Sequence, residues 1–257
     1  SPTMTFFGLQ AIVRQYLEGV VVTDAKIQVA KRVLAAHFGS PDIFNEAGWR
    51  YILTQHDGRL PVRICAVPEG TTVPTHHVLM TIENTDPNCA WIAEYLETLL
   101  SHVWYSSTVC TRSRGMRATI LAALEQSGDP SLIDFKLHDF GCRGVSSMET
   151  AAIGAAAHLV NFKGSDTLPG LTLAAAVYHE DCAGYSIPAA EHSTITSWGR
   201  EQEVDAFANM LTAYPSGLVA VVSDSYDIFA ACENLWGERL REQVLNRDGV
   251  LVIRPDS

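Results

Sequence analysis

The stretch KLHDFGCRGVSSMETAAIGAAAHLVNFKGSDT, residues 136–167, decides the fold class of this 257-residue chain. Strand-like runs flank a segment of helix-forming residues, which predicts a strand at 134–140, a helix at 146–157 and a strand at 158–163. Ser146 and Glu149 have the spacing of a capping box, so the helix is expected to begin there. A helix start is also favourable for anions, although capping alone explains these two residues.

The same alternation continues to the end of the chain. The pattern predicts helices at 168–178, 193–211 and 225–246 and strands at 218–223 and 249–254. Near-continuous apolar strands such as GLVAVVSD are typical of parallel βα units whose two faces are both covered. Such folds bind ligands beyond the carboxyl ends of the strands. The side chains expected at those ends are His138, Phe140, Arg143, Asp166, Asp224, Arg254 and Asp256.

The first hundred residues have a different organisation. Helical spacing is evident at 6–19, 23–39 and 45–56, and the segments 60–70 and 76–86 alternate like strands around a turn-rich link. Two long helical patterns follow, at 88–104 and 106–127. We therefore expect an α+β domain over residues 1–104 and an α/β domain over residues 105–257.

Composition narrows the function classes. Eighteen basic and 29 acidic residues give a net charge of −11, which argues against a general binder of nucleic acid or anionic membranes. Six scattered cysteines without a C-x-x-C pair indicate reduced thiols, and no signal peptide or membrane-spanning run is present. These features predict a cytoplasmic location.

Several of the side chains expected at strand ends, and that of His192 in the loop before the helix expected at 193–211, have two interpretations. Phe140 is either a core residue or a stacking plate for an aromatic ligand, and Asp166 is either a turn former or an acceptor for an amide NH2. His192 is either a loop or cap residue or a nucleophile. Asp224 and Asp256 suit ribose hydroxyls, or Mg²⁺ held through water. The histidines form no H-x-H pair, and no P-loop or G-x-G-x-x-G motif occurs.

Several long motifs carry a family resemblance. The opening stretch, together with AVPEGTTVPTHHVLMTIENTDP, GYSIPAAEHSTITSWG, VVSDSYDIFAACENLWGE and VIRPDS, resembles the nicotinamide phosphoribosyltransferases, which are type II phosphoribosyltransferases. The resemblance runs along essentially the whole chain. It implies an incomplete parallel (β/α) barrel over 105–257, preceded by part of a smaller α+β domain. It also implies transfer of the phosphoribosyl group of phosphoribosyl pyrophosphate (PRPP) to nicotinamide, giving nicotinamide mononucleotide and pyrophosphate in NAD salvage.

The resemblance also implies roles for individual residues. In the nicotinamide pocket, Phe140 would stack on the pyridine ring and Asp166 would accept from the carboxamide NH2. Arg143 would contact the carboxamide and the phosphate side, and His138 and Ser186 would line the pocket. For the phosphoribosyl donor, Arg254, Asp224 and Asp256 would hold ribose, pyrophosphate and Mg²⁺, the ion being bound mainly through pyrophosphate and water. His192 would be phosphorylated by ATP, a stimulating co-substrate. The family forms a homodimer whose partner supplies a second aromatic plate.

Departures from the family pattern leave alternatives open. Cys142, Met148 and Ala220 stand where tyrosine, glutamine and serine are expected. The N-terminal D-S-Y-K motif and the C-terminal glycine-rich phosphate loops are absent, and the chain stops directly after a strand, so the segment alone is expected to be inactive. The rival functions are a nicotinate phosphoribosyltransferase, which Asp166 disfavours by charge repulsion, and an inactive fragment that serves only as an assembly module. A barrel metallohydrolase is disfavoured, because the sequence lacks the metal ligands of that class.

Overall fold

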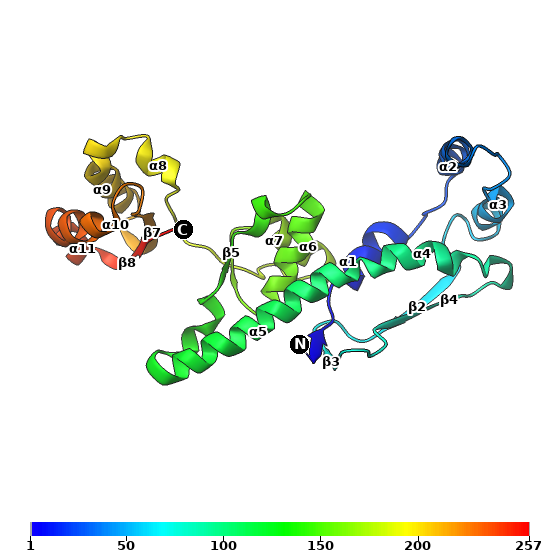
Figure 1. The fold of residues 1–257 in the computed structure, drawn as a ribbon, viewed down its shortest axis with the longest axis horizontal. Helices are drawn as coiled ribbons and strands as arrows, with labels where there is room; N and C mark the ends of the chain where they lie inside the picture. Colours follow the sequence, from blue (N-terminus) through cyan, green and yellow to red (C-terminus); the bar gives the residue numbers. More distant parts are fainter. Residues whose placement is uncertain (1, 257) are drawn as a thin grey trace. The chain divides into compact units, whose positions relative to one another are not determined.

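The computed structural model describes residues 2–256 as a mixed α/β protein. The chain forms two compact units, Ser1–Tyr185 and Ser186–Ser257 (Figure 1). The boundary expected after residue 104 falls near the start of the long helix α5 (Val103–Ser127) and stays a prediction. In the part of the chain that the structure describes, no helix is both long and apolar enough to cross a membrane.

The first half of the first unit combines helices with two small antiparallel sheets. Strand β1 (Thr3–Thr5) pairs with β3 (Thr72–Pro74), and β2 (Val62–Ala66) pairs with β4 (Met80–Asn84). The link between the two expected strands is thus partly a strand itself, because β1 supplies it with a partner. The helical elements here are α1 (Leu9–Ile12), the π-helix η1 (Val13–Leu17), α2 (Asp24–Phe38), α3 (Glu46–Gln55), the 3-10 turn η2 (Pro87–Cys89) and α4 (Ile92–Ser101).

One apolar core holds these elements together. Phe6, Ile52 and Ile92 are fully buried in it and come from three segments that are distant in the sequence. Burial of a side chain of this size contributes about 1.5–3 kcal/mol. The alternating residues of β2 and β4 place one face of their sheet against this core, as the period of two predicts.

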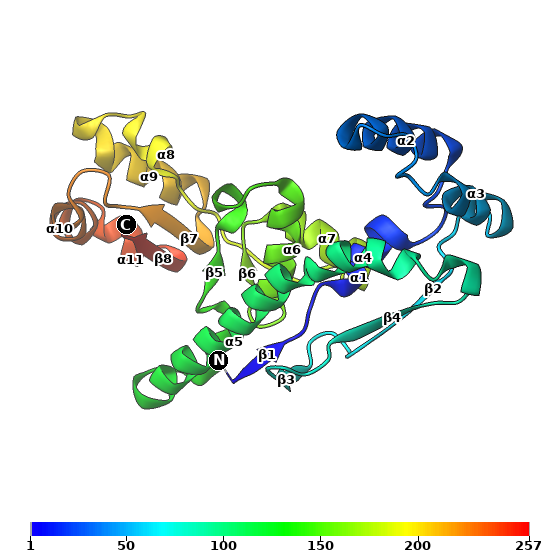
Figure 2. The ribbon, with the colours of Figure 1, turned by 45° about the vertical axis from the view of Figure 1, so that its right-hand side comes forward.

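The quoted stretch forms a short parallel βαβ unit. Strands β5 (His138–Asp139) and β6 (Gly164–Ser165) are parallel neighbours, and α6 (Met148–Leu159) connects them (Figure 2). An isolated parallel bridge from Gly164 to Tyr185 extends this ladder. Helix α6 packs on α5 and on α7 (Leu168–Tyr178). The 3-10 segments η3 (Pro130–Phe135) and η4 (Gly141–Gly144) precede and follow β5.

Three expectations about this stretch were wrong in detail. Residues 158–163 continue α6 and then turn, and the strand begins only at Gly164. Helical spacing wins because His158 and Phe162, four residues apart, stack at 5.1 Å between ring centroids. Residues 134–137 do not join the first strand. The N-cap is Ser147, not Ser146: the Ser147 side chain accepts from the Thr150 amide at 3.1 Å.

The second unit is a two-stranded parallel sheet with helices around it. Strands β7 (Ser216–Val222) and β8 (Asp248–Arg254) pair along their whole length, and Ala189 bridges to Ala220 on the other side of β7. Phe207 and Trp236 stack in the core at 4.5 Å. The helical elements are α8 (His192–Thr196), the 3-10 turn η5 (Arg200–Gln202), α9 (Glu203–Ala213), α10 (Ile228–Ala230), the π-helix η6 (Ala231–Arg239) and α11 (Arg241–Leu245).

The strands of this unit agree with the sequence pattern to within two residues. The single helix expected at 193–211 is instead divided between α8 and α9. Gly199 lies between them with φ 82°, a left-handed conformation that an α-helix does not accommodate. The helix expected at 225–246 begins at Ile228, after Asp227, whose carboxylate accepts from the amides of Phe229 and Ala230.

Candidate functional site

The first candidate cluster lies at the carboxyl ends of β5 and β6. His138 Nε2 is 3.0 Å from Asp166 Oδ1, although the two residues are 28 positions apart. The His138 ring also lies against Phe140, with ring centroids 4.6 Å apart and planes tilted by 35°. Phe140 is 53% exposed, so it is not a core residue. The structure therefore brings together three of the residues predicted at strand ends.

Asp139 holds the loops of this cluster in place. Its carboxylate accepts from the Gly141 amide and from the Ser165 hydroxyl, both at 2.9 Å. Its main-chain carbonyl accepts from the Asp166 amide at 2.9 Å. Charge-assisted bonds of this kind are stronger than neutral ones, so the backbone leading to Phe140 and Asp166 is well anchored.

A buried histidine, His158, contacts the residue that precedes β5. His158 is 6% exposed, and its Nδ1 lies 3.1 Å from the Ser113 hydroxyl, while Nε2 lies 3.3 Å from the Leu137 carbonyl. Burial lowers the pKa of His158, and the charge of Asp139 only partly offsets that effect. His158 is therefore neutral near pH 7.

A cavity of about 230 Å³ lies beside these residues, and His138, Phe140 and His158 are among its lining side chains. It is smaller than the usual site for a drug-sized ligand, which begins at about 300 Å³. Its size suits one small ring. An exposed aromatic plate beside a carboxylate can bind a planar ring that carries a hydrogen-bond donor.

The other two residues predicted for the pyridine side lie at exposed positions. Arg143 is exposed in η4. Ser186 is exposed at the start of the second unit, and its hydroxyl donates to the Ile187 carbonyl at 3.5 Å. Among the departures from the family pattern, Met148 is 59% exposed and Ala220 is buried in β7. Cys142 is half-buried in η4.

The second candidate cluster lies at the carboxyl ends of β7 and β8. His192 Nε2 is 2.9 Å from Asp224 Oδ1, and His192 Nδ1 is 3.8 Å from Asp256 Oδ2. The Asp256 amide donates to the other Asp224 oxygen at 2.6 Å. Arg254, the last residue of β8, donates to the Ala190 carbonyl at 3.0 Å, and its Nε is buried without a hydrogen-bond partner. All four residues were predicted from the sequence, and the structure brings them together.

The charge state of Asp224 fixes the tautomer of His192. Burial acts to raise the pKa of Asp224, but hydrogen bonds from the Asp256 amide and from His192 outweigh burial and lower it. An ionised carboxylate only accepts hydrogen bonds. In neutral His192, Nε2 therefore carries the proton that Asp224 accepts, and Nδ1 carries the lone pair of a nucleophile.

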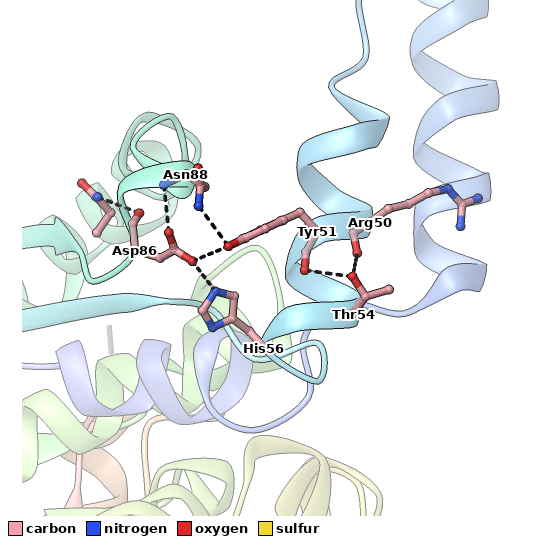
Figure 3. A network of polar contacts seen from close by, with 7 residues as sticks. Arg50, Tyr51, Thr54, His56, Asp86 and Asn88 are labelled. Atoms are coloured by element: carbon pink, nitrogen blue, oxygen red, sulfur yellow. Dashed lines mark hydrogen bonds and ion pairs between the residues drawn. The ribbon is translucent and has the colours of Figure 1, made fainter.

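A third polar cluster, around Asp86, is structural. One Asp86 oxygen accepts from the Asn88 amide, and the other contacts the Tyr51 hydroxyl at 3.0 Å and His56 Nε2 at 2.8 Å (Figure 3). Within this cluster, His56, Asp86 and Cys89 have the spacing of metal ligands. However, burial and the charge of Asp86 raise the pKa of the Cys89 thiol, which opposes the thiolate that a metal needs. This network joins α3 to η2 and carries no metal assignment.

Sequence reasoning missed the residues that hold the first cluster in place. Ser113, His158, Gly164 and Ser165 meet the cluster only through pairings between distant segments. Their one available signal was the parallel βαβ pattern, which places residues 138 and 164 side by side.

Comparisons with known proteins define the class first. Residues 135–257 match the nicotinate phosphoribosyltransferase (NAPRTase) family. Residues 1–64 match the N-terminal domain of nicotinamide phosphoribosyltransferase. Both matches belong to the phosphoribosyltransferases of pyridine bases.

Relatives that match almost the whole chain are more specific. The chain is 57% identical to a nicotinamide phosphoribosyltransferase of Xanthomonas campestris, over 98% of this chain and 54% of that protein. It is 31% identical to one of Acinetobacter baylyi, over 99% of this chain and 53% of that protein. The chain is thus similar to nicotinamide phosphoribosyltransferases along almost its whole length. It spans about half the length of the curated relatives it matches.

Proposed function

We propose that the protein transfers the phosphoribosyl group of PRPP to the pyridine nitrogen of nicotinamide, giving nicotinamide mononucleotide and pyrophosphate for NAD salvage. One observation carries the proposal: His138 contacts both the exposed ring of Phe140 and the carboxylate of Asp166, so an aromatic face and a hydrogen-bond acceptor meet at one side chain. The ring offers a face to a pyridine, and the carboxylate accepts from an NH2 group. The pyridine nitrogen already has a lone pair, so the reaction needs no strong general base.

The second cluster suits the phosphoribosyl donor. Arg254 keeps a buried Nε without a hydrogen-bond partner, and a guanidinium with a donor to spare favours an anionic group such as pyrophosphate. Asp224 and Asp256 fit Mg²⁺, which proteins usually bind through one or two carboxylates together with substrate phosphates. When bound, the ion neutralises the charge that develops on the leaving pyrophosphate. By resemblance, we assign Arg143 to contacts with the carboxamide of nicotinamide and with the phosphate side of the site.

We further propose that His192 accepts a phosphoryl group from ATP at Nδ1. Asp224 supports this role because it fixes the proton on Nε2. The neighbouring Asp256 carboxylate repels an incoming phosphate, so the step is expected to require a divalent cation. This account gives ATP the role of a stimulating co-substrate.

The larger assembly is also a proposal. The two parallel sheets with helices between their strands are consistent with part of a (β/α) barrel. The exposed Phe140 ring leaves room for a second aromatic plate from the partner of a homodimer. A cytoplasmic location stays a prediction.

Nicotinate phosphoribosyltransferase is the second candidate, because the family match over residues 135–257 carries that name. Asp166 disfavours it, since a carboxylate facing the carboxylate of nicotinate is repulsive.

The test is a product assay on the full-length protein with PRPP, Mg²⁺ and either base, separately, analysed by mass spectrometry. We expect nicotinamide mononucleotide and an equal amount of pyrophosphate from nicotinamide. Product from nicotinate alone would replace the first candidate with the second, and no product from either base would remove both.

A further inference from the structure

We propose that His138 is a specificity-determining residue that holds Asp166 in the direction needed to select a carboxamide over a carboxylate, and that Gly164 provides the space for it. The inference rests on the proposed function. In this account His138, a residue of β5, positions the Asp166 carboxylate that would contact the base.

The first support is the geometry of the pair. His138 Nε2 is 3.0 Å from Asp166 Oδ1, and the two side chains are only 26% and 37% exposed. The Asp166 main chain is fixed by its amide bond to Asp139. The remaining freedom of Asp166 is therefore the rotation of its side chain, and the His138 bond restricts that rotation.

The second support is the close approach of the His138 ring to the neighbouring strand. His138 and Gly164 are paired residues of β5 and β6. A Cβ at position 164 would lie 2.6 Å from His138 Nδ1 and 3.2 Å from its Cγ, so any larger residue would displace the ring. Glycine at 164 is thus required for the position of the imidazole and not for backbone conformation.

The third support is chemical. An ionised carboxylate only accepts hydrogen bonds, so the His138 nitrogen that faces Asp166, Nε2, carries a hydrogen and donates it. A carboxylate fixed in this way is preorganised to accept from a carboxamide NH2, and binding does not have to order it first. Nicotinate offers a second negative charge instead of a donor. Loss of the His138 bond should therefore weaken nicotinamide binding and leave nicotinate binding poor. The ratio of the two affinities, which favours nicotinamide, should then become smaller.

The experiment compares His138→Ala, His138→Gln and Gly164→Ala in the full-length protein, with His37→Gln as a control at an exposed histidine of α2. Both dissociation constants, for nicotinamide and for nicotinate, are measured by calorimetry. KM for nicotinamide, KM for PRPP and kcat are measured beside them.

We expect His138→Ala and Gly164→Ala to weaken nicotinamide binding about tenfold, the usual effect of a lost hydrogen bond to a charged group. KM for PRPP should stay within about twofold. His138→Gln keeps a donor and should recover part of the loss. An unchanged nicotinamide affinity in His138→Ala, or equal losses for nicotinamide and PRPP, would overturn the inference, because the second result indicates general damage.

A measurement independent of turnover keeps the inference separate from the proposed function. The ¹⁵N shifts of the His138 ring report its tautomer, and Asp166→Asn should change them, since an amide does not select Nε2–H. Unchanged shifts would overturn the pairing. A changed shift in a protein that makes no nicotinamide mononucleotide would refute the proposed function while leaving the His138–Asp166 pair in place.

Discussion

At the scale of single residues, the two clusters have the same design. In each, a histidine and an aspartate meet at the carboxyl ends of parallel strands, His138 with Asp166 and His192 with Asp224. The surroundings then separate their roles. His138 of the first pair lies against the exposed ring of Phe140, and His192 of the second pair lies 3.8 Å from a further carboxylate, that of Asp256. Arg254, whose Nε is buried without a partner, ends the strand that leads to Asp256. An aromatic amide suits the first environment, and phosphate chemistry suits the second.

Replacement of Asp166 tests the first assignment. Asp166→Asn removes the negative charge and keeps a polar side chain of the same shape, so nicotinate is no longer repelled. We expect the ratio of kcat/KM for nicotinamide to that for nicotinate to fall about tenfold. Asp42→Asn, at an exposed aspartate, is the control. An unchanged ratio would remove Asp166 from this role.

Replacement of His192 tests the second assignment. If Nδ1 accepts a phosphoryl group, incubation with labelled ATP and Mg²⁺ should leave an acid-labile, alkali-stable phosphate on the protein. His192→Ala should abolish the label and the stimulation of turnover by ATP, whereas His37→Ala should retain both. Equal labelling of His192→Ala would contradict the assignment.

The buried histidine predicts a dependence of stability on pH. Burial depresses the pKa of His158, so its neutral form is favoured in the folded state. Above its unfolded value of about 6.5 both states are neutral and the contribution to stability is complete. As pH falls from there towards the folded pKa, the unfolded state binds more protons and stability is lost.

We therefore expect the unfolding free energy, measured in urea, to decrease below about pH 6.5. His158→Gln should reduce the slope between pH 6.5 and 5, although the variant is less stable overall, and His37→Gln should leave the slope unchanged. A slope that is identical in His158→Gln would show that another group causes the acid sensitivity.

At the scale of elements, the N-cap of α6, the helix of the βαβ unit, can be tested by mutation. The Ser147 side chain accepts from the Thr150 amide, whereas Ser146 lies outside the helix. We expect Ser147→Ala to lower the unfolding free energy by about 1 kcal/mol and Ser146→Ala to change it by less than about 0.5 kcal/mol. The reverse order would restore the capping box that the sequence suggested at Ser146.

The elements also show what a sequence pattern can and cannot predict. Strands β7 and β8 were predicted to within two residues because each is a continuous apolar run between polar ends. The strand expected at 158–163 failed because an apolar run fits a helix equally well, and the stacking of His158 on Phe162 favours the helix. Gly199 interrupts a helical pattern whose apolar spacing alone gives no sign of a break.

At the scale of the whole molecule, the same contrast holds for the candidate sites. Parallel βα alternation was enough to place His138, Asp166, Asp224 and Asp256 at strand ends, because the carboxyl ends of paired parallel strands lie together. The pairings of His158 with Ser113 and of His138 with Gly164 depend on tertiary packing over tens of residues. The periodicity of one segment does not predict contacts between segments that are distant in the sequence.

The central claim is selection of nicotinamide as the acceptor of the phosphoribosyl group, and a competition experiment tests it most directly. The full-length protein receives PRPP, ATP, Mg²⁺ and equimolar isotopically labelled nicotinamide and nicotinate in one vessel, and mass spectrometry follows both mononucleotides. The initial product ratio equals the ratio of the two kcat/KM values. We predict nicotinamide mononucleotide in excess by about tenfold or more. An excess of nicotinate mononucleotide would contradict the assignment of Asp166 and the function built on it.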